Sequence, residues 1–217
     1  MEINHLSADQ VMFQLLHQRT TTERFKLPYS SEETSNMLMA GVKAEVEKRC
    51  RKFEYNNFLK NQASRIADWL TNDNSAFGLL LCGKCGNGKT TFVKAFQQLL
   101  VILNPKDEGY CIGMKIRDAR TISNICKRDY KLWESICWEP MLAIDDLGTE
   151  PVEVLDFGNV LSPIVDLLYR RYEQQLFTIV TTNLTPGEIR KRYGDRIADR
   201  LNEMMVKVIF ENDTYRK

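Results

Sequence analysis

Stretches with helical periodicity alternate with short apolar runs from residue 57 to the end of the chain. Apolar residues spaced three and four apart predict amphipathic helices, whereas short runs rich in Val, Ile and Leu predict buried strands. Their alternation is typical of an α/β fold with a parallel sheet and helices on its faces. The predicted strands are 77–82, 110–115, 141–144, 177–182 and 206–210, and the predicted helices are 58–70, one ending near 100, 119–127, 157–174 and two short helices after residue 183.

The first 56 residues have a different pattern, of two helices separated by a polar segment. Ser7 and Gln10 form a capping-box signature before the apolar residues of a first helix. The segment Thr20–Ser35 is rich in Thr and Ser, so we expect a loop. Apolar residues spaced four apart from Leu38 onward then predict a second helix. Residues 1–56 are therefore interpreted as a helical N-terminal arm, which either docks on a partner or packs on the core.

Composition narrows the class of protein without naming a partner. With 217 residues, 43% of them hydrophobic and 27% charged, the chain is globular and long enough for one domain with an appendage. The 30 basic and 29 acidic residues leave a net charge of +1, so nucleic-acid binding would need a local patch. No apolar run approaches the roughly 18 residues of a membrane span, and the N-terminus does not resemble a secretory signal. We therefore expect a cytoplasmic protein with no membrane partner, whose six cysteines are thiols.

The residues between the first predicted strand and its helix read GKCGNGKT, which is a complete P-loop motif. Glycines let backbone N–H groups converge on phosphates, and the helix N-terminus adds partial positive charge. Lys89 is expected to reach the β- and γ-phosphates of ATP, and the Thr90 hydroxyl to bind Mg²⁺. Cys82 and Cys85 have no second cysteine pair nearby, so we interpret their spacing as part of this loop rather than a zinc or redox motif. The predicted nucleotide-binding residues are Gly83, Lys84, Cys85, Gly86, Asn87, Gly88, Lys89, Thr90 and Thr91.

Two aspartates follow the predicted strand 141–144 directly. In P-loop NTPases such a strand lies near the P-loop strand, and its first aspartate holds Mg²⁺. Asp145 fits that role together with Thr90. Asp146 can orient or deprotonate the attacking water, which predicts an ATPase that releases ADP and phosphate. The alternative is a pair of acids that only cap the strand.

Polar residues also follow the later strand and helix. Asn183 ends the strand 177–182, where its amide can hold water against the γ-phosphate; the alternative is an ordinary turn residue. Gly194 is expected to end one helix before the next, on which Arg196 and Arg200 lie four residues apart. The spacing predicts two arginines projecting together from one edge. The alternative is an exposed basic face paired to neighbouring aspartates.

These motifs together resemble the AAA+ helicase-loader family of bacteria, the DnaC and DnaI proteins, and the related IstB-type transposition helpers. The resemblance covers about residues 57–217 and rests on GKCGNGKT, LAIDDLGTE, TTN, YGDRIADRL and NDTYR. It implies an AAA+-type P-loop ATPase domain over 57–217, with no C-terminal helical lid. It also implies that Asn183 is a sensor-1 residue and that Arg200, or alternatively Arg196, is an arginine finger reaching a neighbouring subunit's ATP. Arg216 is the implied sensor-2 arginine.

The function that the resemblance implies is ATP-dependent loading of a replicative helicase in DNA replication, with ATP and Mg²⁺ as cofactors. Its implied partners are the helicase, single-stranded DNA and, on ATP binding, further copies of the chain. The alternative is a transposition helper that binds duplex DNA and a transposase. Asp146 stands where AAA+ proteins usually have glutamate, which suggests slow hydrolysis.

Basic and aromatic side chains are interleaved around the predicted helix 119–127. Such a surface can follow a single-stranded phosphate backbone and stack on bases. The alternative is a solvated helix whose aromatic residues pack on the core. The residues are Arg117, Arg120, Lys127, Arg128, Tyr130, Lys131 and Trp133.

Overall fold

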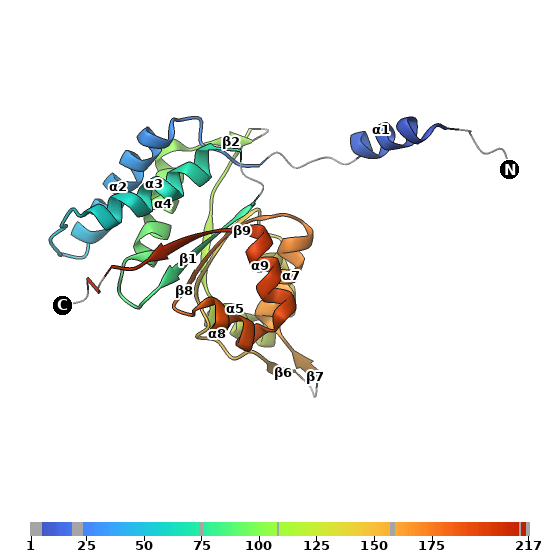
Figure 1. Cartoon of the computed structure of the whole chain (residues 1–217). Coiled ribbons are helices and arrows are strands. Elements are labelled where there is room, and N and C mark those ends of the chain that lie inside the picture. Colours follow the sequence, from blue (N-terminus) through green and yellow to red (C-terminus); the bar gives the residue numbers. More distant parts are fainter. Residues whose placement is uncertain are drawn as a thin grey trace.

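A five-stranded parallel sheet forms the centre of the protein, with helices on both faces (Figure 1). The computed structural model describes residues 6–18, 24–73, 76–107, 109–156, 159–212 and 214–215. The strand order is β4-β5-β8-β1-β9, and this confirms the predicted α/β fold. The strands are β1 (Gly78–Gly83), β4 (Lys115–Asp118), β5 (Met141–Leu147), β8 (Phe177–Thr182) and β9 (Met205–Phe210).

Each face of the sheet carries its own apolar core. Leu79 and Leu81 of β1 pack with one core, and the alternating residues Leu80 and Cys82 pack with the other, as the pleat of a strand requires. The first core is covered by α2 (Ser31–Glu47), α3 (Asn57–Thr71) and α4 (Lys89–Leu103). The second is covered by α5 (Ala119–Arg128), α6 (Tyr130–Cys137), α7 (Pro163–Glu173), α8 (Pro186–Tyr193) and α9 (Asp195–Met204).

The two N-terminal helices relate differently to the sheet. Helix α1 (Ala8–Gln18) begins with the predicted capping box, in which Ser7 and Gln10 exchange backbone-to-side-chain hydrogen bonds. Figure 1 shows α1 away from the sheet. Helix α2 instead packs on α3 and α4 through the buried Leu38 and Val42. Packing on the core therefore begins well before residue 56, while a separate role for residues 1–56 stays a prediction.

Three predicted boundaries are wrong. The second sheet strand is 115–118 rather than 110–115; β3 (Tyr110–Cys111) forms a small hairpin with β2 (Lys106–Asp107). The helix predicted over 157–174 begins at Pro163, because proline fits the first helical turn but not the interior. The hairpin β6 (Val154–Asp156) and β7 (Asn159–Leu161) precedes it. The loop predicted over 20–35 ends at Ser30, where a capping box with Glu33 starts α2.

Helix α6 was not predicted, and it follows α5 after a single residue. Asp129 ends α5 and caps α6 by accepting a hydrogen bond from the backbone N–H of Leu132.

Within the part of the chain that the structure describes, no helix has both the length and the apolar character of a membrane span. Cys50, Cys85 and Cys111 are exposed thiols, whereas the other three cysteines are buried thiols.

Candidate nucleotide-binding site

The P-loop connects β1 to the N-terminus of α4 at the carboxyl edge of the parallel strands. Gly86 and Gly88 have φ angles of 81° and 100°, in the left-handed region that side chains other than glycine rarely adopt. A Cβ atom at Gly83 would collide with the carbonyl oxygen of Phe210 in β9. The buried Asn87 donates through Nδ2 to the same oxygen at 2.7 Å. Strand β9 therefore leaves no room for a side chain at Gly83 and holds the loop through Asn87.

Lys89 is the central side chain of the site and is only 5% exposed. Its Nζ donates to Asn183 Oδ1 at 2.8 Å, which joins the P-loop to the end of β8. It also donates to the carbonyl oxygens of Gly83 and Lys84 at 2.7 and 2.8 Å. Burial lowers the pKa of the Lys89 ammonium, because desolvation disfavours its charge. Lys89 and Asn183, which were predicted from separate motifs, are therefore in direct contact.

A hydroxyl and a carboxylate meet beside Lys89. Thr90 Oγ1 donates to Asp145 Oδ1 at 2.9 Å, and Thr181 Oγ1 donates to the same carboxylate oxygen at 2.6 Å. Among the described residues no group of three or more His, Cys, Asp or Glu side chains is placed to hold a metal. Mg²⁺ in nucleotide sites typically needs only one or two carboxylates, with phosphates and water as further ligands. Thr90 and Asp145 therefore fit the predicted magnesium site.

Asp146 interrupts strand β5 beside this pair. Its φ of 55° is left-handed, which for a residue other than glycine costs on the order of 1–3 kcal/mol. The pairing of β5 with β8 shifts register between Ile144 and Leu147, so the strand bulges at the two aspartates. The Asp146 N–H donates to Thr181 Oγ1 at 2.9 Å, which holds the bulge to β8.

The C-terminal segment crosses the P-loop. The Tyr215 N–H donates to the Gly86 carbonyl at 2.9 Å, and Asn212 Nδ2 donates to the Asn87 carbonyl at 3.2 Å. Asn56, which caps α3, donates to the Tyr215 hydroxyl at 2.9 Å. The sequence did not predict the contacts of Asn212 and Tyr215 with the P-loop, although both residues belong to the NDTYR motif. The predicted sensor-2 residue, Arg216, lies outside the described residues.

The two arginines of α9 have different surroundings. The Arg200 guanidinium lies 3.9 Å from the centre of the Tyr169 ring and donates to Glu173 Oε1 at 3.2 Å, so α7 holds it. Arg196 is exposed. Arg200 is therefore held against α7 while Arg196 lies at the surface, and the expectation that the two side chains project together stays a prediction. Their roles as arginine fingers stay predictions.

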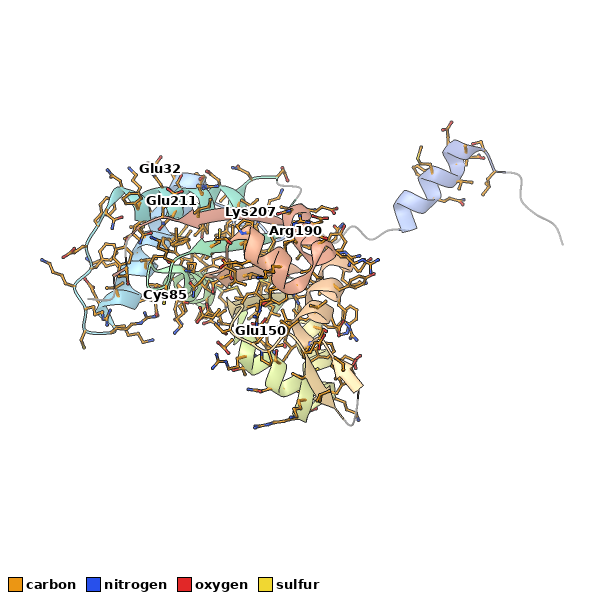
Figure 2. All side chains as sticks on the ribbon, turned by 60° about the horizontal axis from the view of Figure 1, so that its bottom comes forward. Glu32, Cys85, Glu150, Arg190, Lys207 and Glu211 are labelled. Carbon is orange, nitrogen blue, oxygen red and sulfur yellow. The ribbon has the colours of Figure 1, made fainter. Side chains whose placement is uncertain are left out.

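Acidic residues near these arginines are paired within the chain, and two of the side chains involved, Arg190 and Glu150, are labelled in Figure 2. Asp195 and Asp199 both accept hydrogen bonds from Arg190 of α8 rather than from the arginines of α9. The buried Glu150, in the loop after β5, accepts a hydrogen bond from the Tyr193 hydroxyl of α8. Helix α8 is therefore tied both to α9 and to the loop that follows the two aspartates.

The candidate nucleic-acid surface on α5 and α6 is partly as predicted. Trp133 is 1% exposed and lies under the Arg170 guanidinium, 5.0 Å from its ring centre. It belongs to the core and cannot stack on bases, so that part of the prediction is wrong. Tyr130 is 46% exposed. The exposed basic residues are Arg120, Lys127, Arg128 and Lys131, whereas Arg117 is half-buried.

No family model matches the sequence, and no curated protein matches it significantly. Solved structures, however, are similar in fold. A crystal structure of the DnaC helicase loader has a TM-score of 0.56 and 21% sequence identity over 74% of this chain and 94% of that chain. DnaI has a TM-score of 0.56 and 16% identity over 79% and 93% of the two chains. The chain shares the α/β P-loop fold of these structures.

A more distant protein shares the same fold. The replication initiator DnaA, bound to AMPPCP and single-stranded DNA, has a TM-score of 0.54 and 16% identity over 74% of this chain and 49% of that chain. At such low sequence identity the similarity shows the fold alone, and function depends on the residues of the site.

Proposed function

We propose that this protein is an ATP-binding and ATP-hydrolysing AAA+ switch that loads a replicative helicase onto DNA. The observation that carries the proposal is the convergence of Lys89, Thr90, Asp145, Asp146 and Asn183 at one edge of the sheet. Lys89 and Thr90 begin α4 after the P-loop, the two aspartates lie in β5 and Asn183 follows β8, so the order of strands in the sheet brings them together. The similarity in fold to DnaC and DnaI supports the loader over a transposition helper.

ATP would bind with its phosphates in the P-loop. Lys89 exchanges its bond with Asn183 for a phosphate oxygen, a charge-assisted contact that is stronger than one to a neutral amide. Thr90 and Asp145 would hold Mg²⁺, which would supply charge neutralisation at the phosphates. Asp146 orients and deprotonates the attacking water, and the amide of Asn183, once released from Lys89, positions that water. The chain thus supplies a group for each part of phosphoryl transfer to water.

A second copy of the chain would complete the site. The exposed Arg196 and the half-buried Arg200 lie on α9, and neither contacts the P-loop in hydrogen bonds that the structure describes. An arginine from a neighbouring subunit stabilises transition-state charge in enzymes of this mechanism. We therefore propose that ATP binding drives self-assembly and that efficient hydrolysis occurs only between assembled subunits.

Helix α1 is the proposed contact with the helicase. Met12 and Phe13 are 59% and 62% exposed on this helix, which stands away from the sheet in Figure 1. Exposed apolar side chains on a helix are the anchors by which helices dock into grooves of partners. Helix α2, in contrast, is already packed on α3 and α4.

The test uses the full-length chain and a purified hexameric helicase on circular single-stranded DNA. We expect ATP-dependent loading that is lost in a Met12→Asp, Phe13→Asp double variant but kept in Ile102→Asp, since Ile102 is 77% exposed on α4 and serves as the matched control. Binding to duplex DNA and a transposase, without any effect on a helicase, would overturn the loader and favour the transposition helper.

A further inference from the structure

One arginine on the exposed face of α5 contacts the loop that follows β5 and its residue Asp146. Arg120 donates through Nε and Nη2 to the carbonyl oxygen of Thr149, at 3.3 and 3.1 Å. The arginine is exposed, and the acceptor of these two bonds is a neutral backbone carbonyl. Helix α5 and the loop after β5 are thereby joined by a contact that solvent and ligands can reach.

Thr149 in turn holds Asp146. Its N–H and Oγ1 both donate to the Asp146 carbonyl, at 3.2 and 2.9 Å. One methylene separates an aspartate carboxylate from its backbone, so the position of the Asp146 carboxylate follows this loop closely. The far end of the loop is anchored by the buried Glu150, which accepts hydrogen bonds from the Tyr193 hydroxyl of α8 and from the Gly148 N–H, the latter at 2.8 Å. Arg120 thus holds the exposed side of a loop whose other side is fixed in the core.

Phosphate is a better partner for Arg120 than the carbonyl that it contacts. Hydrogen bonds between a guanidinium and an anionic oxygen are charge-assisted and form in bidentate pairs, so they are stronger than bonds to a neutral carbonyl. Lys127 lies two turns further along the same exposed face of α5. The nearby acids Asp118 and Asp129 both accept backbone N–H bonds at helix N-termini. A phosphate chain along α5 therefore meets Arg120 and Lys127 on one face.

We propose that Arg120 is a positioning residue through which single-stranded DNA controls ATP hydrolysis. When DNA lies on α5, a backbone phosphate takes Arg120 from the Thr149 carbonyl, and the released loop lets the Asp146 carboxylate advance toward the attacking water. The inference rests on the proposed ATPase function and adds a route by which DNA regulates the same site. Without DNA, the contact keeps turnover low.

The experiment compares ATP turnover with and without saturating oligothymidylate, at saturating ATP. Wild type is expected to turn over ATP faster with DNA. Arg120→Ala is expected to hydrolyse ATP without DNA at the stimulated rate, and DNA should change that rate no further. Lys127→Ala should weaken DNA binding and reduce its salt slope by about 1, yet still respond to saturating DNA. Lys94→Ala, an exposed charge removed on α4, is the control for charge alone.

Hydrogen exchange separates this inference from the ATPase proposal. The Thr149 N–H, which donates to the Asp146 carbonyl, should exchange faster when oligothymidylate binds wild type. The inference is overturned if Arg120→Ala keeps the wild-type rates with and without DNA, or if exchange at Thr149 does not change. An active ATPase that ignores DNA overturns this inference alone, whereas absence of ATP hydrolysis in wild type overturns the proposed function as well.

Discussion

Lys89 and Asn183 lie 94 positions apart in the chain, and their side chains meet at 2.8 Å between Nζ and Oδ1. They meet because β1 and β8 are adjacent parallel strands that end at the same edge of the sheet. In this state the amide supplies an acceptor to a buried ammonium. In the proposed mechanism a phosphate at the same place would replace that acceptor and free the amide, and the pair would then connect nucleotide binding to the placement of water.

Replacement of Lys89 tests the nucleotide site directly. Lys89→Ala should weaken ATP binding by about 10- to 100-fold, because it removes a charged hydrogen bond worth about 1.5–3 kcal/mol. Titration with a fluorescent ATP analogue measures the affinity, and circular dichroism confirms folding. Wild-type affinity in a folded variant would rule out the P-loop as the binding site.

The two aspartates should separate binding from hydrolysis. Asp146→Asn should keep ATP affinity but slow turnover by roughly 10²–10⁴-fold, the usual contribution of a general base. Asp145→Asn should instead raise the Mg²⁺ concentration needed for half-maximal activity, since it weakens the metal ligand. Steady-state ATPase assays over a Mg²⁺ series distinguish the two. Normal turnover in both variants would mean that the carboxylates are structural.

The arginines of α9 should act across a subunit boundary. Arg200→Ala should bind ATP but hydrolyse it slowly, since a fully engaged arginine finger contributes about 10³–10⁵ in rate. It should also lower thermal stability, because Arg200 lies on the Tyr169 ring, whereas Arg196→Ala should not. Mixing Arg200→Ala with Lys89→Ala should restore some activity at mixed interfaces. If mixing restores no activity, and Arg196→Ala loses activity while Arg200→Ala keeps it, then Arg196 is the arginine finger.

Thiol labelling offers a test that does not depend on mutation. Cys85 is exposed in the P-loop, so bound ATP should slow its reaction with a maleimide, while the exposed Cys50 serves as the internal control. Burial raises the pKa of Cys137 to about 12, so below that pH it is a thiol rather than a reactive thiolate. Mass spectrometry of labelled peptides follows each site. Equal labelling of Cys85 with and without ATP would contradict nucleotide binding here.

A buried arginine should contribute strongly to stability. Arg171 is fully buried, donates to Thr178 Oγ1 at 2.8 Å and also donates to the backbone carbonyls of Cys137, Glu139 and Phe177. Arg171→Met should lower the free energy of unfolding by about 3 kcal/mol or more, because it leaves these buried acceptors unsatisfied. The neighbouring Arg170→Met, a partly exposed control, should cost about 1 kcal/mol or less. Urea unfolding measures both; equal losses would contradict the argument.

The sequence determined the elements that depend on local chemistry. Periodicity located the strand 177–182 with its observed bounds, and the P-loop glycines predicted a turn whose positive φ angles the structure contains. Capping at Ser7 followed from residues three positions apart. Such features depend on contacts within a few residues, which a linear pattern contains.

Only the tertiary structure decided which distant side chains meet. Trp133 lies in the core of the second face, on a helix that was not predicted, and Arg200 is held by α7. The contacts of Tyr215 with the P-loop and of Arg120 with Thr149 depend on the order of strands in the sheet. Helical and strand periodicity specify which face of an element is apolar, but they do not specify which element packs against it. That choice depends on the free energy of the whole packed chain.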